Sequence, residues 1–101
     1  MAIVVQYRVK SDRAAENEEL IASVFEQLER EKPEGIRYVS FKAADGVSFT
    51  HIAIVDTADG KNPLVALEAF KRFASTIRER CEVPPVTMEL REVASYRMFD
   101  A

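Results

Sequence analysis

The chain has 101 residues, of which 48% are hydrophobic and 31% charged, with a net charge of −3 at pH 7. These values are typical of one globular domain, which we expect to span residues 1–101, and no apolar run is long enough to cross a bilayer. Lysine and arginine are scattered without a basic stripe, which argues against nucleic-acid binding. A single cysteine, Cys81, excludes an internal disulfide, and we expect a cytoplasmic protein.

The first elements follow from hydrophobic periodicity. Residues 3–9 predict a strand that is buried mainly on the side of Tyr7. Residues 13–31 predict a helix, because apolar residues recur at helical spacing along one side and Pro33 follows. Residues 36–42 predict the second strand.

The stretch 47–56 reads Val-Ser-Phe-Thr-His-Ile-Ala-Ile-Val-Asp and predicts the third strand, because it is rich in β-branched residues and free of proline. It carries the only histidine of the chain, His51. Side chains on a strand alternate between two faces, so the odd-numbered residues share one face and the even-numbered residues the other. Both faces become apolar toward the end of this strand, so both need cover.

The Ala-Asp-Gly stretch at 44–46 predicts the turn before this strand, and two registers fit it. A three-residue turn with a glycine bulge would set Val39 opposite His51. A two-residue turn would instead place Tyr38 and Ser40 on the face of the histidine. We favour the first register because it pairs apolar side chains with apolar side chains.

Residues 62–80 predict the second helix, since an Asn-Pro pair is a good helix start, and we expect a break near its first turn. The two prolines at 84–85 predict that the helix does not continue. Residues 86–96 predict the last strand. Three residues near the end are expected to dock on another surface, namely Tyr96, Met98 and Phe99, and Tyr38 and Tyr96 are expected near a dimer contact.

This order of elements predicts an α+β fold, the ferredoxin-like βαββαβ arrangement, with two helices on one face of an antiparallel sheet. Nothing in the chain is left to cover the face that carries Thr50, Ile52 and Ile54. Because monomers rarely expose such a face, we expect a homodimer in which two sheets meet. Each isoleucine buried there would contribute about 1.5–3 kcal/mol.

Five stretches carry a resemblance to a known family: Ile-Val-Val-Gln-Tyr-Arg-Val-Lys at 3–10, Ala-Glu-Asn-Glu-Glu-Leu at 15–20, Lys-Pro-Glu-Gly-Ile at 32–36, Phe-Thr-His-Ile-Ala at 49–53 and Ala-Phe-Lys-Arg-Phe at 69–73. With them the chain resembles the antibiotic biosynthesis monooxygenase-like family of the dimeric α+β barrel superfamily. The resemblance spans nearly the whole chain and implies a pocket between the sheet and the helices.

The resemblance also implies a range of activities. The family includes cofactor-independent oxygenases of aromatic polyketides, haem-degrading monooxygenases and members without an assigned reaction. The haem-degrading members use an asparagine, a tryptophan and a histidine. This chain has no tryptophan, with Val55 at the corresponding place, and it has no histidine on the second helix and no asparagine on the first strand. We therefore expect no haem, and no cofactor or metal site is indicated elsewhere.

His51 is the candidate catalytic residue, because an imidazole facing the pocket could act as a general base or hold a phenol by a hydrogen bond. The alternative is a structural histidine that bonds only to its neighbours. Tyr7, Arg37 and Val39 would line the same pocket on the sheet side. Further lining residues would be Phe49, Val55, Phe70 and Phe73, although an aromatic stripe at helical spacing is more often plain core.

Two kinds of function fit these residues. The first is a cofactor-independent monooxygenase acting on a small aromatic or polyketide-type molecule, whose carbanion itself reacts with oxygen. The second is a homodimer without catalytic activity that binds a small molecule or takes part in a stress response. A regulatory ligand-binding module ranks last, because the chain has no room for a DNA-binding domain.

Overall fold

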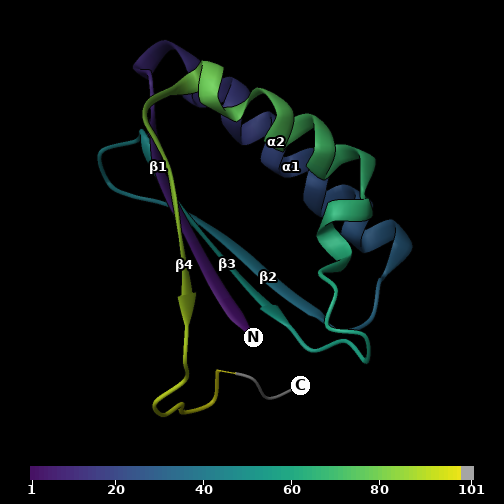
Figure 1. Ribbon diagram of the computed structural model, residues 1–101. Coiled ribbons are helices and arrows are strands. Elements are labelled where there is room, and N and C mark those ends of the chain that lie inside the picture. The colour runs from purple at the N-terminus through teal and green to yellow at the C-terminus, as the bar shows by residue number, and fades with distance from the viewer. Residues whose placement is uncertain (99–101) are drawn as a thin grey trace.

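The computed structural model describes residues 1–98, which form four strands and two α-helices in the order βαββαβ. Their bounds are β1 Ala2–Val9, α1 Ala14–Glu31, β2 Ile36–Lys42, β3 Ser48–Val55, α2 Glu68–Arg80 and β4 Cys81–Leu90 (Figure 1). Short 3-10 turns, Ser11–Arg13 and Pro63–Ala66, precede the two helices. No helix in this part of the chain is both long and apolar enough to cross a membrane.

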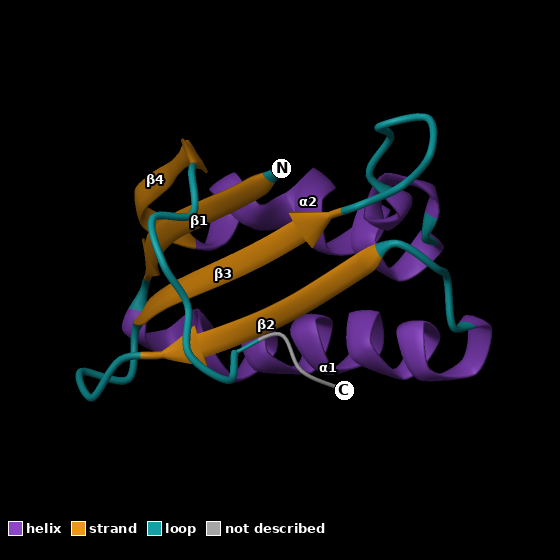
Figure 2. Ribbon diagram, turned by 90° about the horizontal axis from the view of Figure 1, so that it is seen from below, coloured by secondary structure: helices purple, strands orange, loops and turns teal. Residues whose placement is uncertain are grey.

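The strands form one antiparallel sheet in the order β2-β3-β1-β4, and both helices cover the same face of it (Figure 2). The predicted ferredoxin-like architecture is therefore confirmed. The break expected at the start of the second helix is also present. Asn62 accepts a hydrogen bond from the Leu64 amide, Pro63 begins the 3-10 turn, and α2 starts only at Glu68.

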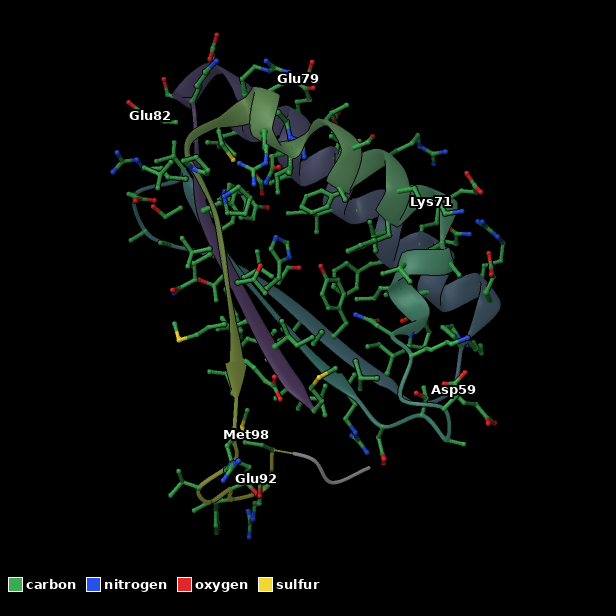
Figure 3. All side chains as sticks on the ribbon, viewed as in Figure 1. Asp59, Lys71, Glu79, Glu82, Glu92 and Met98 are labelled. Atoms are coloured by element: carbon green, nitrogen blue, oxygen red, sulfur yellow. The ribbon has the colours of Figure 1, made fainter. Side chains whose placement is uncertain are left out.

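The core lies between the helices and the sheet. Along β3 every second residue is buried, which is the alternation expected of a strand whose one face is covered by helices. On α2, Lys71 and Glu79 point away from the sheet, so the opposite side of the helix supplies the packing (Figure 3). The buried cluster contains Tyr7, Val9, Val24, Phe49, Ala53, Leu64, Leu67, Ala69, Phe73 and Ile77.

The favoured hairpin register is wrong, and the alternative is correct. Ser40 lies opposite His51, and Val39 lies opposite Ile52. The reason is the Asp45 side chain, whose Oδ1 accepts hydrogen bonds from the amides of Val47 (2.9 Å) and Ser48 (2.8 Å). These bonds hold Val47 in the turn, so the strand begins one residue later than predicted.

The last strand also differs from the prediction. β4 begins directly after α2 at Cys81, continues through Pro84 and Pro85, and ends at Leu90. The prolines are tolerated because β4 is an edge strand and its pairing with β1 shifts register near them. Tyr96 lies beyond the strand and is 76% exposed, so it docks on nothing within the described residues. Phe99 lies outside the described residues.

The other face of the sheet is not covered by the helices (Figure 2). Thr50, Ile52 and Ile54 of β3 are half-buried there. They are surrounded by large apolar side chains that are exposed, namely Val39, Phe41, Val86, Met88 and Leu90. We call this surface the open face; a hollow of about 1470 Å³ lies between it and the chain that follows β4.

Candidate functional site

His51 lies near the middle of β3 on the helix-covered face, and only 3% of it is exposed. The two sheet ladders fix its position, because Val5 of β1 and Ser40 of β2 lie directly opposite it on either side. Its imidazole is therefore held from both neighbouring strands as well as by the helices above. The imidazole is therefore held in one orientation toward its hydrogen-bond partners.

Aromatic rings stack on both sides of the imidazole. The stack runs Phe49, Tyr7, His51, Tyr38, Phe25, with successive ring centroids 5.6, 5.3, 5.9 and 5.2 Å apart and neighbouring planes within 15° of parallel. Offset stacking at these distances is favourable for aromatic rings. We call this row the ring stack.

Both imidazole nitrogens have hydrogen-bond partners inside the chain. Nε2 lies 2.7 Å from the Tyr7 hydroxyl. Nδ1 lies 2.6 Å from Ser40 Oγ and 3.1 Å from the Tyr38 hydroxyl. His51 therefore joins a polar pair on β2 to a tyrosine on β1.

The hydrogen bonds continue from Tyr7 into the helices. Asn17 Nδ2 donates to the Tyr7 hydroxyl at 2.9 Å, and Arg80 Nε donates to Asn17 Oδ1 at 2.9 Å. Arg80 also donates to Thr76 Oγ1 at 2.6 Å and to the Phe73 carbonyl at 3.0 Å. The groups that lead from Arg80 to the sheet are called the polar relay: Arg80, Asn17, Tyr7, His51, Ser40 and Tyr38.

The relay is deeply buried and fully bonded. Asn17 and Arg80 have no exposed surface. Among the described residues, every buried side-chain nitrogen and oxygen has a hydrogen-bond partner. Since an unpaired polar group in the interior costs about 1–3 kcal/mol, this complete pairing stabilises the site in a single arrangement.

Burial also sets the protonation states. It lowers the pKa of His51 to about 4, so the imidazole is neutral at neutral pH. Burial raises the pKa of Tyr38 to about 12 and raises the pKa of Tyr7 further, although the Asn17 hydrogen bond opposes the rise at Tyr7. Burial lowers the pKa of Arg80, which as a guanidinium keeps its proton. The resting site thus holds one cation, Arg80, and otherwise neutral groups.

An opening of about 350 Å³ lies between the second half of α1 and β2. Phe25 and Tyr38, the end of the ring stack, lie in its wall. Leu28, Pro33 and Ile36 add apolar surface, with Glu29 and Lys32 as the charged residues. Tyr38 therefore connects this opening to His51, which lies behind it.

The structure brings together three of the residues that the sequence predicts for the site. Tyr7 bonds to His51, Phe73 meets the imidazole edge-on with centroids 5.4 Å apart, and Phe49 stacks on Tyr7. Phe70 is one ring further away, 6.2 Å from Phe73. The general-base role of His51 stays a prediction, and the low pKa makes it a weak base unless an anion lies beside it.

Two predicted lining residues belong to the opposite face. Arg37 lies opposite Ile54 and Val39 opposite Ile52, so both are on the open face, away from His51. The cause is the hairpin register described above, because a shift of one residue moves every side chain of β2 to the other face. Val55 is buried at the end of β3, opposite Ile36, and is not among the residues that line the opening.

Sequence reasoning missed Asn17 and Arg80, and it assigned Tyr38 to a dimer contact. A signal for the first two was present. Asn17 precedes Leu20 by three residues, and Arg80 follows Ile77 by three, so each extends the apolar stripe of its helix. A polar residue that continues such a stripe is a candidate for a buried hydrogen-bond network.

The usual metal ligands are not clustered in the part of the chain that the structure describes. Within residues 1–98 no three or more histidine, cysteine, aspartate or glutamate side chains are grouped closely enough to hold one. The polar relay contains hydroxyl, amide, imidazole and guanidinium groups, and none of them is a carboxylate or thiolate. Its chemistry is therefore that of hydrogen bonding and proton exchange.

The fold is similar to that of solved structures of antibiotic biosynthesis monooxygenases. No family model matches the sequence, and no curated protein matches it. A crystal structure of an antibiotic biosynthesis monooxygenase has a TM-score of 0.75 at 17% identity, over 92% of this chain and 98% of the other.

Other solved structures share the fold. A mutant of SnoaB, a cofactor-independent oxygenase from Streptomyces nogalater, has a TM-score of 0.63 at 20% identity, over 91% of this chain and 93% of that one. NE2512, a protein of unknown function from Nitrosomonas europaea, has a TM-score of 0.72 at 14% identity, over 94% and 90%. At such identities the likeness establishes the fold, and activity must be argued from the site.

Proposed function

We propose that the protein is a cofactor-independent oxygenase of small, flat aromatic ketones and phenols, bound in the opening between α1 and β2. The observation that carries this proposal is the position of Tyr38. Its side chain lines the opening, and its hydroxyl lies 3.1 Å from Nδ1 of a neutral, buried His51. A ligand hydroxyl that bonds to Tyr38 would thus be linked to the His51 imidazole through the Tyr38 hydroxyl.

The volume and the lining of the opening support an aromatic ligand. Its volume of about 350 Å³ suits a molecule of two or three rings. Phe25 lines the opening and ends the ring stack, so its outer face is left for a ligand ring to stack on. The exposed Lys32, which pairs with Glu29 at 3.9 Å, places an ammonium at the opening that an acidic group on the ligand would share.

The chemistry would begin with loss of a proton from the ligand. A fused-ring ketone with an acidic ring CH2 forms an enolate, and this electron-rich anion supplies the electrons that reduce oxygen. One atom of O2 enters the ring as a new carbonyl and the other leaves as water, so CH2 and O2 become C=O and H2O. The protein's own part is to bind the anion, to exclude bulk water and to exchange protons through Tyr38, Ser40 and His51.

A second copy of the chain is part of the proposal. The open face carries a contiguous apolar surface, with Phe41 54% and Met88 52% exposed. Such patches on a soluble protein usually mark an interface. Two sheets packed through this face would form a symmetric dimer, with the openings on the outer, helix-bearing sides.

The test is oxygen uptake with anthrone, a three-ring ketone of this chemistry, together with labelled O2 to locate the new oxygen atom. Wild type should accelerate uptake and put one labelled atom into the product. Tyr38→Phe and Ser40→Ala should each lower kcat/KM about tenfold, since each removes a hydrogen bond at the site. Ser75→Ala removes an exposed hydroxyl from α2 and should leave the rate unchanged. Equal rates in all four proteins would contradict the proposal.

Binding without catalysis is the second candidate, and one observation favours it. His51 is 3% exposed and both of its nitrogens are already bonded within the chain. A protein of this kind would bind anthrone or 1-naphthol saturably but would not accelerate oxygen uptake. The same assay, run beside a binding titration, separates the two functions.

A further inference from the structure

In each hydrogen bond of the polar relay one group donates and the other accepts, and the chemistry of the side chains determines which is which. A guanidinium only donates hydrogen bonds, so the Asn17 atom 2.9 Å from Arg80 Nε must be the amide oxygen. The amide nitrogen of Asn17 then faces Tyr7 and donates to its hydroxyl at 2.9 Å. Arg80 thus determines which end of the Asn17 amide meets the tyrosine.

Tyr7 links the Asn17 amide to His51 through its hydroxyl group. Its hydroxyl oxygen accepts from Asn17, so its single proton is free to donate to His51 Nε2 at 2.7 Å. Among the described residues this proton has no other acceptor, since the hydroxyl bonds only to Asn17 and His51, so Nε2 accepts it and carries no proton of its own. A neutral imidazole has one N–H, which must therefore be on Nδ1.

The far end of the relay is a donor. Nδ1–H donates to Ser40 Oγ at 2.6 Å, with the Tyr38 hydroxyl at 3.1 Å as its second neighbour. These hydroxyls keep their own protons, which they can offer to a further acceptor. Tyr38 lines the opening, so a ligand that reaches its hydroxyl meets a hydrogen-bond donor.

Arg80 is an unusual core residue, and its guanidinium lies over the Phe73 ring, 5.2 Å from the centroid. It is fully buried, and among the described residues no acidic side chain forms an ion pair with it. Burying a guanidinium without a carboxylate is costly, so its hydrogen-bond partners must offset the loss of water. Its hydrogen bonds to Asn17, Thr76 and Phe73 hold it in one orientation, which suits a group that orients the relay.

We propose that Arg80 and Asn17 are positioning residues that hold His51 in the Nδ1–H tautomer, so that the site presents donors to the opening and binds its aromatic ligand as the anion. The ligand part of this statement rests on the proposed function. The tautomer part concerns the protein alone and can be tested without a ligand.

The tautomer test uses nuclear magnetic resonance of protein with labelled histidine, because the chain has one histidine and so gives one imidazole. Wild type at neutral pH should show the Nδ1–H form. Asn17→Asp should reverse it, because a carboxylate only accepts: Tyr7 turns its proton toward the new carboxylate, and Nε2 must then donate to Tyr7. The Nε2–H form in wild type, or an unchanged tautomer in folded Asn17→Asp, overturns the proposal.

Gln27→Glu is the matched control. Gln27 is a second buried amide on α1, and its bonds, to Glu31 and to the Ala69 amide, lie outside the relay. This variant makes the same amide-to-carboxylate change on the same helix. It should leave the His51 tautomer as in wild type. A reversed tautomer in Gln27→Glu would show that added charge alone moves the proton, and it would remove the special role of Asn17.

The ligand test uses p-nitrophenol, whose phenolate absorbs at longer wavelength than the phenol. Wild type should lower the apparent pKa of the bound probe, and Asn17→Asp should weaken phenolate binding about tenfold or more, since a donor has become an acceptor. Preferential binding of the neutral phenol to wild type overturns the ligand part. If the tautomer results hold and no form of the probe binds, the proposed function fails and the positioning roles stand.

Discussion

Ser40 lies directly opposite His51 in the β2–β3 ladder, and its Oγ is 2.6 Å from Nδ1. This pairing decides what the site is. It places Tyr38 on the same face, closes the hydrogen bonding of the imidazole, and turns Arg37 and Val39 to the open face. The register of one hairpin therefore separates the residues that serve the relay from those that serve the surface.

Stability should depend on pH through His51. Its pKa is about 4 in the folded protein and about 6.5 when unfolded, so the unfolded state binds more protons between these values. The free energy of unfolding should therefore fall as the pH drops from about 6.5 to about 4, by about 3 kcal/mol from this residue. Urea unfolding across this range measures the loss.

The matched variant for this measurement is His51→Gln, which keeps one donor and one acceptor but does not titrate. Asp45 and Glu16, whose pKa values are lowered by hydrogen bonds to Ser48 and Arg13, also weaken the protein as pH falls. They are unchanged in the variant, so the difference between the two curves isolates His51. Parallel curves would show that the histidine titrates normally in the folded state.

Removing Arg80 should destabilise the protein through Asn17. Arg80→Met preserves much of the side-chain volume but leaves the Asn17 oxygen buried without its donor. We expect a loss of about 1–3 kcal/mol in the free energy of unfolding. Arg78→Met, an exposed change on the same helix, should stay within about 0.5 kcal/mol of wild type. Equal effects of the two changes would mean that the relay contributes nothing to stability.

Charge on the open face should separate the proposed dimer. Phe41→Lys places an ammonium at an apolar surface and does so twice in a symmetric pair. Loss of two apolar contacts of about 1.5 kcal/mol each should weaken the dimer at least about a hundredfold. Analytical ultracentrifugation measures the dissociation of both variants. Val93→Lys, at a 98% exposed position beyond the sheet, is the control and should remain a dimer. A wild-type monomer at micromolar concentration would contradict the dimer.

Gly35 should be far less replaceable than Gly46, although both have left-handed backbone angles, φ +79° and +78°. A Cβ on Gly35 would lie 2.6 Å from Thr57 Cγ2 and 2.8 Å from the Asp56 carbonyl oxygen, whereas one on Gly46 meets nothing. Alanine at either site adds backbone strain of about 1–2 kcal/mol. Gly35→Ala should lose about 1–3 kcal/mol more through overpacking, as thermal unfolding of both variants would show. Similar losses in the two variants would mean that the backbone at Gly35 shifts to make room for the added Cβ.

The sequence predicted the architecture well because periodicity carries it. The hydrophobic alternation along β3 and the apolar stripes of α1 and α2 show which residues are buried, and that is enough to predict the strand and the helices. The hairpin register depended on the side-chain bonds of Asp45 to the turn, which no hydrophobic pattern reveals. Choosing the apolar pairing for Val39 therefore gave the wrong face.

The candidate site could be predicted only in part. His51, Tyr7 and Phe73 were identifiable because they sit on predicted inner faces. Asn17 bonds to Tyr7, ten residues away in the sequence, and to Arg80, sixty-three residues away. Asn17 and Arg80 come together only because α1 packs on α2. Polar partners of this kind are set by tertiary contacts, which local pattern does not contain.

The most direct measurement is the imidazole spectrum of His51, recorded without oxygen so that no turnover occurs, as anthrone is added. If a ligand in the opening reaches the relay through Tyr38, the His51 resonances move saturably with anthrone, and Tyr38→Phe reduces the change. If His51 is unaffected while anthrone saturates the protein elsewhere, the imidazole is a structural group and the opening does not serve it.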